Sequence, residues 1–171
     1  MLTLMLLRHA KAELGMATLA DKDRSLAQRG RADAPRLGAF VESEGLRPDL
    51  VLCSTARRTR ETWELAQAAM SKPVETQFEA GIYEASTARL LAIVRRTPAS
   101  VKRLLLIGHN PGFEELASDL IRDGEPVAMA RIDKKYPTSG LAVLTFAQTQ
   151  WPQITPRSAR LTHFTAPAYL K

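Results

Sequence analysis

Cysteine and histidine are scarce in this chain of 171 residues. It has one cysteine, Cys53, and three histidines, at positions 9, 109 and 163. A single cysteine cannot form an intramolecular disulfide or a thiolate metal cluster, and no two of the histidines have the short spacing of a local metal site. The sequence therefore predicts no metal and no other cofactor, and it is compatible with the reducing environment of the cytoplasm.

Aromatic residues and long apolar runs are also scarce. Aromatic residues make up 6% of the chain, and no apolar run approaches the roughly 20 residues that cross a bilayer. The opening segment Met1 to Leu7 is apolar, but it has no basic leader and Arg8 interrupts it, so we expect a buried first strand rather than a signal peptide. We expect no membrane partner.

Basic residues outnumber acidic ones by 24 to 18, which gives a formal charge of +6. This balance favours acidic ligands, and phosphate compounds are the natural class. The densest basic cluster, at positions 57–60, is followed by Glu61 and Glu64 and lacks the interleaved aromatic residues of a nucleic-acid surface. We therefore expect no nucleic-acid partner.

Short apolar runs alternate with amphipathic stretches, and this alternation predicts an α/β fold in one domain that covers residues 1–171. Strands are expected at Leu2 to Leu7, Leu50 to Cys53, Val74 to Phe78, Arg103 to Gly108 and Leu141 to Phe146. Helices are expected at Leu26 to Glu44, Ala56 to Met70, Thr87 to Arg96 and Phe113 to Arg122. Pro35 should kink or split the first helix, and Gly124 should end the last. The tail from Trp151 to Lys171 is expected to be irregular, with one edge strand at most.

Two of the expected strands run into a histidine. The first ends at Arg8-His9, and the fourth ends at Gly108 and continues as His109-Asn110-Pro111-Gly112. Open α/β sheets bind ligands beyond the carboxyl ends of their strands, so the two histidines are expected to meet over one substrate. An arginine fork matches phosphate oxygens, and a neutral imidazole can attack a phosphoryl group. A loop histidine bonded to backbone remains the alternative for each motif taken alone.

A cluster of arginines begins the helix that follows the second strand, in the order Ser54-Thr55-Ala56-Arg57-Arg58-Thr59. Helix N-termini attract anions through their free N–H groups, and an arginine in the first turn strengthens such a site. We expect one of these arginines to reach phosphate. The alternative is a solvated helix face on which the arginines pair with Glu61 and Glu64, and this is the preferred interpretation for Arg60.

Two other phosphatase patterns fail. Cysteine-dependent phosphatases place an arginine six residues after the cysteine, but Thr59 occupies that position after Cys53. The segment Asp21 to Ser25 looks like the nucleophile loop of haloacid dehalogenase-type phosphatases. No convincing strand precedes it, so we treat it as a coincidence.

Taken in order, the motifs resemble those of the histidine phosphatase superfamily. They are Leu7-Arg8-His9-Ala10, Asp23-Arg24-x-Leu26-x-x-x-Gly30, Ser54-x-Ala56-x-Arg58-Thr59-x-x-Thr62, Gly108-His109-Asn110-Pro111-Gly112 and Leu141-x-x-Leu144-x-Phe146. Within the superfamily the chain looks like the short phosphohistidine phosphatase (SixA-like) branch. The resemblance implies a phosphoglycerate mutase-like fold, a three-layer α/β/α sandwich with a mostly parallel central sheet.

The resemblance also implies a role for each motif residue. His9 would be the nucleophile that becomes phosphorylated, and Arg8, Arg58 and His109 would bind and neutralise the phosphoryl oxygens, with the Asn110 backbone N–H as a further donor. Glu84 follows the third strand, where the superfamily often places its general acid, although a surface carboxylate is an equal alternative. The implied reaction is two in-line displacements through a phosphohistidine intermediate, without a metal.

Some positions depart from the family pattern. Ala10 replaces the usual glycine after the catalytic histidine, and Ala12 and Gly15 replace polar residues of the mutase-like members, which argues against a mutase. The short chain leaves little room for a lid, so the pocket should be open to a phosphorylated protein side chain. The sequence predicts a phosphatase of protein phosphohistidine. The alternatives are a phosphatase of a small phosphate ester and a non-catalytic module that binds phosphorylated residues.

Overall fold

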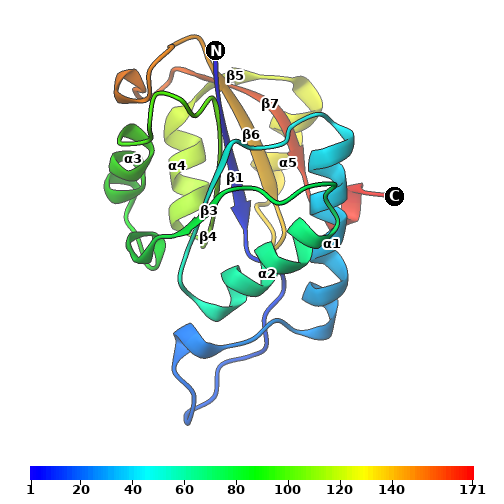
Figure 1. Cartoon of the computed structure of the whole chain (residues 1–171). Coiled ribbons are helices and arrows are strands. Elements are labelled where there is room, and N and C mark those ends of the chain that lie inside the picture. The colour runs from blue at the N-terminus through cyan, green and yellow to red at the C-terminus, as the bar shows by residue number, and fades with distance from the viewer.

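The computed structural model describes residues 1–171, and seven strands form one sheet at its centre (Figure 1). The spatial order of the strands is β3-β2-β4-β1-β6-β7-β5. Their bounds are Leu2–Arg8 for β1, Leu50–Cys53 for β2, Thr76–Phe78 for β3, Arg103–Gly108 for β4, Ile121–Gly124 for β5, Leu141–Phe146 for β6 and Ala159–Thr165 for β7.

Strands β3, β2, β4 and β1 are parallel, β6 runs antiparallel to β1, and β7 runs antiparallel to β6 and parallel to β5. The registers bring the ends of three strands to one level. Arg8 of β1 is paired with Gly108 of β4, and Cys53 of β2 is paired with Ile107. The residues that follow these strands must therefore emerge side by side at one edge of the sheet.

Five helices cover the two faces of the sheet. They are α1 (Gln28–Ser43), α2 (Arg57–Ala68), α3 (Thr87–Arg95), α4 (Gly112–Leu120) and α5 (Pro126–Lys134). None of these helices combines the length and the apolar character that crossing a bilayer would require.

Alternate side chains of β1 enter two separate cores, as the two-residue period of a strand requires. Leu4 and Leu6 belong to a core of 27 buried residues beneath α3, α4 and α5, whereas Met5 and Leu7 belong to a core of 14 buried residues beneath α1 and α2. The fold is thus the expected three-layer α/β/α sandwich with a mostly parallel sheet.

The sequence prediction placed five of the seven strands, namely β1, β2, β3, β4 and β6, and four of the helices correctly, but it was wrong about the region around Gly124. The fourth predicted helix ends at Leu120, and Gly124 ends a strand, β5, instead of a helix. Only Ile121 of β5 is buried, so this strand has no apolar alternation to recognise. Helix α5 was not predicted, although Pro126 at its start suits the first position of a helix.

Two further expectations need correction. Pro35 does not split the first helix, because α1 runs unbroken from Gln28 to Ser43. The strand in the tail, β7, is not an edge strand, since β6 pairs with it on one side and β5 on the other. Its buried residues Leu161 and Phe164 belong to the larger core.

Candidate active site

The two strand-end histidines meet. His9 follows β1 and His109 follows β4, and their ring centroids lie 5.4 Å apart. The His9 backbone N–H donates to the Gly108 carbonyl at 3.0 Å, which holds the two chain segments level. Gly108 is required here, because a Cβ at this position would lie 2.6 Å from Cζ of Phe113 and 2.7 Å from a methyl carbon of Ile82. The level ends of β1 and β4 therefore account for the pairing of residues 100 positions apart.

His9 is buried, with 8% of its surface exposed. Its Nδ1–H donates to the Ala10 carbonyl at 2.7 Å, so Nε2 carries the free lone pair. Burial lowers the pKa of His9 to about 4; the hydrogen bond to Ala10 opposes this, and the positive charges of Arg58 and Arg8 add to it. His9 is thus a neutral imidazole at physiological pH, with one nitrogen tied down and the other available for attack.

The segment after His9 is anchored to α2. The Ala10 N–H donates to Oγ1 of Thr62 at 3.0 Å, and the Thr62 hydroxyl donates in turn to the Arg58 carbonyl at 2.7 Å. On the other side, the Ser139 N–H donates to the His9 carbonyl at 3.0 Å. These contacts fix the backbone of His9 relative to the first turn of α2.

A hydroxyl orients His109. Its Nε2 lies 2.8 Å from Oγ of Ser54, and that Oγ already accepts the Ala56 N–H at 3.3 Å, so the Ser54 hydroxyl proton is free to donate to Nε2. The ring proton then sits on Nδ1, which is buried and has no partner in the chain. Burial, followed by the charges of His9 and Arg58, lowers the pKa of His109 to about 3. His109 therefore offers one unpaired N–H donor beside His9.

Of the three arginines that begin α2, Arg58 alone is buried, with 6% of its surface exposed. Its Nη1 donates to the Asp21 carbonyl at 2.9 Å and its Nη2 to the Asp21 carboxylate at 3.1 Å, while Nε has no partner. Arg57 forms an exposed ion pair with Glu61 at 3.4 Å. Arg60 is also exposed, as expected. The expected ion pair with a glutamate does not form, because Nε of Arg60 donates to the Thr55 carbonyl at 3.1 Å instead.

Arg8 and Asn110 lie at the ends of the same two strands as the histidines. Nη1 of Arg8 donates to the Tyr136 carbonyl at 2.9 Å, and its buried Nε has no partner. The Asn110 side chain is engaged in the turn before α4, where its Oδ1 accepts the Glu114 N–H at 3.2 Å. The Asn110 backbone N–H makes no hydrogen bond within the chain.

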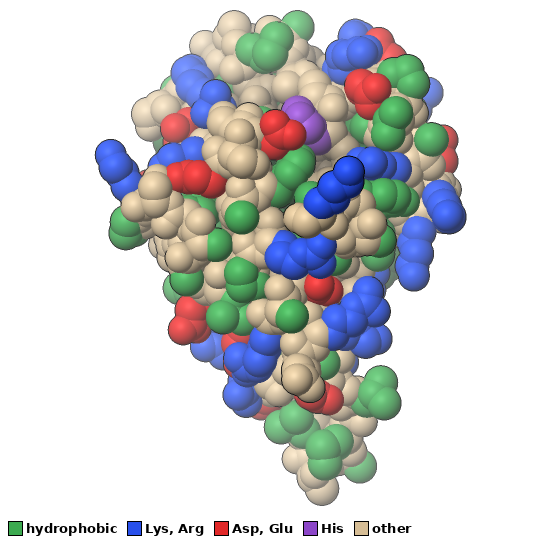
Figure 2. All heavy atoms as spheres, turned by 90° about the vertical axis from the view of Figure 1, so that its right-hand side faces the viewer, with side chains coloured by type: hydrophobic (Ala, Val, Ile, Leu, Met, Phe, Trp, Pro, Cys, Tyr) green, Lys and Arg blue, Asp and Glu red, His purple; other side chains and the backbone are tan.

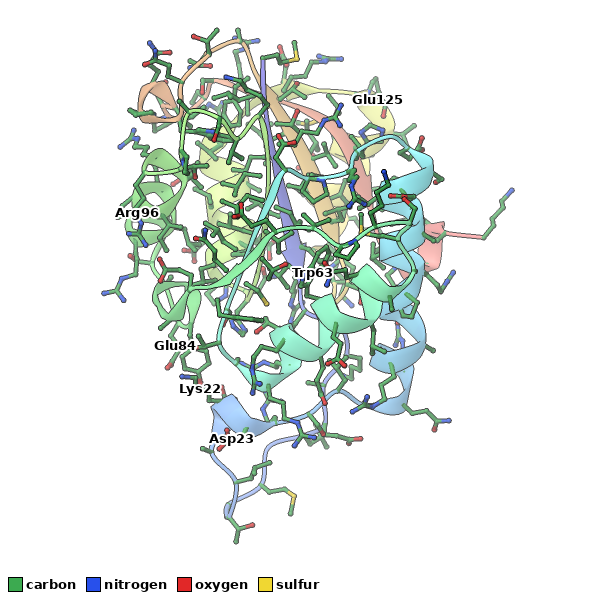
Figure 3. The ribbon with its side chains drawn as sticks, viewed as in Figure 1. Lys22, Asp23, Trp63, Glu84, Arg96 and Glu125 are labelled. Carbon is green, nitrogen blue, oxygen red and sulfur yellow. The ribbon has the colours of Figure 1, made fainter.

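An open cavity of about 480 Å³ lies at these strand ends, and Arg58, His109, Asn110 and Glu84 are among the residues that line it. Arg8 and His9 are not part of its lining, but the His9 ring lies 5.4 Å from the ring of His109, which is. Glu84 has a left-handed backbone conformation with a φ of 54° and makes no hydrogen bond or ion pair. Figure 3 shows Glu84 at the lower left of the molecule, close to Lys22. The structure thus brings Glu84 to the same cavity as Arg58 and His109.

Asp21 was missed as a site residue. Its carboxylate accepts hydrogen bonds from Nε of Arg24 at 2.9 Å, from Arg58 and from the Tyr83 hydroxyl at 2.5 Å. The Tyr83 hydrogen bond, followed by the nearby Arg58 charge, holds the pKa of Asp21 at about 2. Asp21 lies in a short 3₁₀ turn, Asp21–Asp23, rather than at the end of a strand, which agrees with rejecting it as an aspartyl nucleophile.

Tyr83 and Arg24 were also missed. The Tyr83 ring lies edge-on to the ring of His109, with 5.4 Å between centroids. Arg24 is tied to the same site through Asp21, whose carboxylate accepts its Nε–H at 2.9 Å, and its positive charge contributes to lowering the pKa of His9. Arg24 lies within one of the family motifs and Tyr83 directly precedes Glu84, but only the folded chain shows that they converge with Asp21.

Cys53 has no role in this site. It is buried, and burial raises the pKa of its thiol to about 12, so a thiolate nucleophile is not available. No group of three or more histidine, cysteine or acidic side chains is arranged to hold a metal ion.

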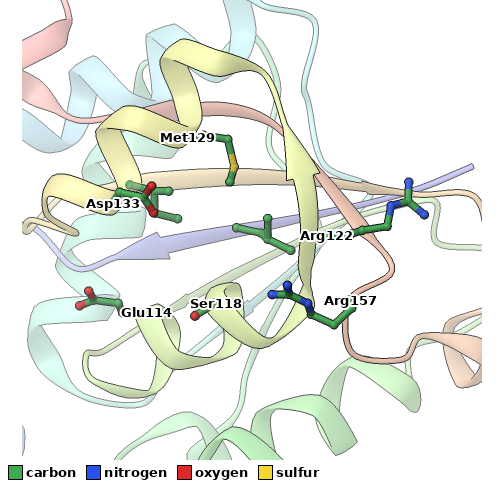
Figure 4. A pocket seen from close by; sticks show the side chains of 8 residues that line it. Glu114, Ser118, Arg122, Met129, Asp133 and Arg157 are labelled. Carbon is green, nitrogen blue, oxygen red and sulfur yellow. The ribbon is translucent and has the colours of Figure 1, made fainter.

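A second cavity, of about 320 Å³, lies between α4, β5 and α5 (Figure 4). Its walls include Glu114, Ser118, Arg122, Asp133 and Arg157. The Arg122 side chain is 61% exposed and forms an ion pair with Asp123 at 3.4 Å. No histidine lines this cavity, and its charged residues are not buried.

Known proteins are similar to this chain in sequence and in fold. A protein of uncharacterised function from Mycobacterium tuberculosis is 36% identical over 163 residues, which cover 94% of this chain and 99% of the relative. The SixA protein of Agrobacterium tumefaciens, described as a candidate phosphohistidine phosphatase, has a crystal structure that superposes with a TM-score of 0.81 and 32% identity over 97% of this chain and 98% of its own.

A more distant likeness concerns the fold alone. A protein histidine phosphatase SixA, solved in complex with tungstate, superposes with a TM-score of 0.75 and 19% identity over 99% of this chain and 100% of its own.

The sequence model of the histidine phosphatase superfamily (branch 1) matches residues 4–110. The matched segment begins within β1 and ends just after β4, so it contains His9, Arg58 and His109. With more than half of the chain matched and a solved relative above 30% identity over nearly its whole length, the chain belongs to the histidine phosphatase superfamily.

Proposed function

We propose that this protein is a phosphatase that removes the phosphoryl group from protein phosphohistidine through a covalent intermediate on His9. The observation that carries the proposal is the state of His9. Its Nδ1–H is bound to the Ala10 carbonyl, its Nε2 carries the lone pair, and its pKa of about 4 keeps the ring neutral beside a buried arginine. This combination describes an activated imidazole nucleophile next to an anion site.

In the first step, Nε2 of His9 attacks the phosphorus atom, a P–N bond forms, and the bond to the leaving imidazole breaks. Arg8, Arg58, the Nδ1–H of His109 and the Asn110 backbone N–H are the donors that would neutralise the phosphoryl oxygens. Each of the three side-chain donors has a nitrogen without a partner in the chain, namely Nε of Arg8, Nε of Arg58 and Nδ1 of His109. Donors prearranged in a buried site stabilise a transition state more than donors in water do.

In the second step, water attacks the phosphohistidine, the P–N bond to His9 breaks, and inorganic phosphate leaves. One proton of the water must be accepted, and one must be supplied to the leaving group of the first step. Glu84 is our candidate for the proton that the leaving group receives, because it lies on the cavity wall and is not engaged in an ion pair. Imidazole leaves more readily than an alkoxide, so a phosphohistidine substrate depends less on this acid than a phosphate ester does.

The cavity is open to the surface, and this supports a protein substrate, because an open cavity can admit a phosphorylated side chain. The relative from Agrobacterium tumefaciens, at 32% identity, is described as a candidate for the same substrate class. The chain itself provides every donor that the two steps use, so we also propose that the reaction needs no metal. A cytoplasmic location remains a prediction.

The first experiment measures phosphate release in excess EDTA from a phosphohistidine protein and from p-nitrophenyl phosphate in parallel. Wild type, His9→Ala and His163→Ala are compared, since His163 lies on β7, outside the site. We expect turnover by wild type and His163→Ala and none by His9→Ala, with the phosphohistidine protein preferred. Preference for p-nitrophenyl phosphate would favour a small phosphate ester as the substrate. Loss of activity in EDTA would contradict the metal-independent mechanism.

The covalent intermediate can be tested separately by acid quenching during turnover. We expect a phosphorylated protein whose label is labile in acid and stable in base, as a phosphohistidine is, and no label in His9→Ala. Stoichiometric binding of phosphoprotein without turnover or label would instead support the binding-module alternative.

A further inference from the structure

A projecting loop next to the active site carries exposed apolar side chains. Every residue at positions 13–20 is exposed, and within this loop tip Leu14 is 81%, Met16 64% and Leu19 40% exposed. Seven large hydrophobic residues are exposed in the whole chain, so nearly half of them gather in six consecutive positions. Single exposed apolar residues are normal on protein surfaces, but a group of them marks an interaction site.

The loop tip is held away from the body of the protein by a fixed neck. The Glu13 N–H donates to the Ser25 carbonyl at 2.9 Å, and Nη1 of Arg24 donates to the Glu13 carbonyl at 2.8 Å. Below this neck, α1 approaches so closely that a Cβ on Gly30 would lie 2.2 Å from the Lys11 carbonyl oxygen. Figures 1 and 2 show the result, a narrow projection at the bottom of the molecule with hydrophobic side chains at its end. The neck therefore presents the loop tip to solvent instead of letting it fold back on the core.

The loop tip leads directly into the catalytic cavity. The residue after it, Asp21, binds Arg58 and Tyr83, and all three line that cavity. The next residue, Lys22, has its Nζ 5.9 Å from the centre of the Tyr83 ring, and Figure 3 shows Lys22 beside Glu84. A molecule bound in the cavity and extending outward would therefore pass the loop tip, whereas a small phosphate ester would not reach it.

We propose that the loop tip, through Leu14, Met16 and Leu19, is a docking surface for the protein that carries the phosphohistidine. This inference rests on the proposed function. The partner would present an apolar patch next to its phosphorylated histidine, and methionine and leucine side chains suit such a contact because they adapt to differently shaped partners. The cavity would recognise the phosphoryl group, and the loop tip would recognise the protein surface around it.

Charge and size on the loop argue against two other occupants. Positions 11–24 carry three basic residues, Lys11, Lys22 and Arg24, and three acidic ones, Glu13, Asp21 and Asp23. Membrane-binding segments combine apolar residues with an excess of lysine and arginine. In this segment the basic and acidic residues are equal in number, although the chain as a whole is basic. A stable dimer buries roughly 800 Å² on each partner, which three side chains on a narrow loop do not supply.

The test uses a triple variant, Leu14→Ser with Met16→Ser and Leu19→Ser, and a control, Val127→Ser. Val127 is 55% exposed on α5, away from the cavity. Two substrates carry the same scissile bond: a histidine-phosphotransfer domain phosphorylated with phosphoramidate, and free phosphohistidine. We expect kcat/KM for the phosphorylated domain to fall by about tenfold or more in the triple variant through a higher KM, as for loss of an apolar contact cluster. Its turnover of free phosphohistidine and both activities of Val127→Ser should match wild type.

Each other result overturns the docking proposal. Equal losses on both substrates would place the loop in the catalytic machinery, and no loss on either would leave it without a partner. Wild type that hydrolyses free phosphohistidine but not the phosphorylated domain would refute docking and leave the phosphatase proposal intact. Wild type inactive on both substrates would refute the proposed function and the docking surface together. Co-sedimentation of wild type, but not the triple variant, with phosphatidylserine vesicles would assign the loop to lipid instead.

Discussion

The two cavities of this protein differ far more in the burial of their charged groups than in their size. The cavity at the strand ends holds about 480 Å³ and the cavity between α4 and α5 about 320 Å³. In the first, the Arg58 side chain is 7% exposed, whereas in the second the Arg122 side chain is 61% exposed. The volumes of the two cavities do not distinguish them, but the burial of the charged side chains does.

Removing a charged group from water costs free energy. A buried charge is therefore stable only where neighbouring groups compensate for this desolvation cost. Asp21 compensates for Arg58 with a carbonyl and a carboxylate oxygen, and both histidines avoid the cost by remaining neutral. In the second cavity, the charged side chains of Glu114, Arg122, Asp133 and Arg157 are all exposed to solvent. The comparison teaches that the cavity proposed as the active site is marked by desolvated groups with shifted pKa values that converge on one space.

The largest difference between the cavities should appear when an arginine in each is replaced by lysine. Arg58→Lys keeps the charge but removes the planar fork, and we expect kcat/KM for the phosphohistidine protein to fall by about 10²- to 10³-fold, the loss typical for a transition-state donor. Arg157→Lys, in the second cavity, should leave it unchanged. Steady-state kinetics of both variants would decide. Similar losses in the two variants would break the comparison.

The next effect is the pH dependence that the first cavity imposes. His9 and His109, at this end of the sheet, have pKa values of about 4 and 3 when folded, below the unfolded value near 6.5. The unfolded chain therefore binds more protons, so this contribution to stability is complete above pH 6.5 and is lost as the pH falls towards 4. For His9 alone, the free energy of unfolding should decrease by about 2 kcal/mol between pH 6.5 and 5.

Urea unfolding of wild type and His9→Asn at pH 7 and pH 5 measures this effect. The variant should lose less stability than wild type by about the same amount, whatever its stability at pH 7. Activity should follow the same group: it should stay level from pH 8 to about pH 6 and decline towards pH 4, where His9 gains a proton. Activity that rises steadily into the acid range would contradict His9 as the nucleophile.

The strand ends beside the first cavity were largely predictable from sequence, because local patterns mark them. An apolar run that ends in Arg8-His9, and another that ends in His109, reveal both the strand and the residue at its end. Parallel strands end at the same edge, so their meeting follows from the fold class. The side of the helix on which Arg58 lies could not be decided in the same way, because burial of one arginine among three depends on what packs against it.

What the sequence could not show were contacts between distant segments. Asp21 reaches Arg58 and Tyr83, which lie 37 and 62 positions away, and no periodicity links a loop residue to such partners. The elements that form the second cavity, β5 and α5, were not predicted for a related reason. Strand β5 is short and polar and forms only by pairing with β7, and α5 begins at a proline that resembles a turn. Tertiary pairing, not local pattern, determines both elements.

The smallest expected effect concerns a carboxylate in each cavity. Glu84→Gln removes the proposed proton donor, and the loss should depend on the leaving group. Phenolate is a poor leaving group, so kcat for phenyl phosphate should fall by about 10- to 100-fold, at the low end for general acid catalysis. The kcat for phosphohistidine should change at most about threefold.

Asp133→Asn in the second cavity should affect neither substrate, because no reacting group lies there. The ratio of the two rates in each variant is the informative quantity, since a loss of folded protein lowers both rates equally and cancels. A Glu84→Gln variant with an unchanged ratio would remove Glu84 from the mechanism. The first cavity would then depend on its buried arginines and histidines alone, and the contrast with the exposed charges of the second cavity would be sharper still.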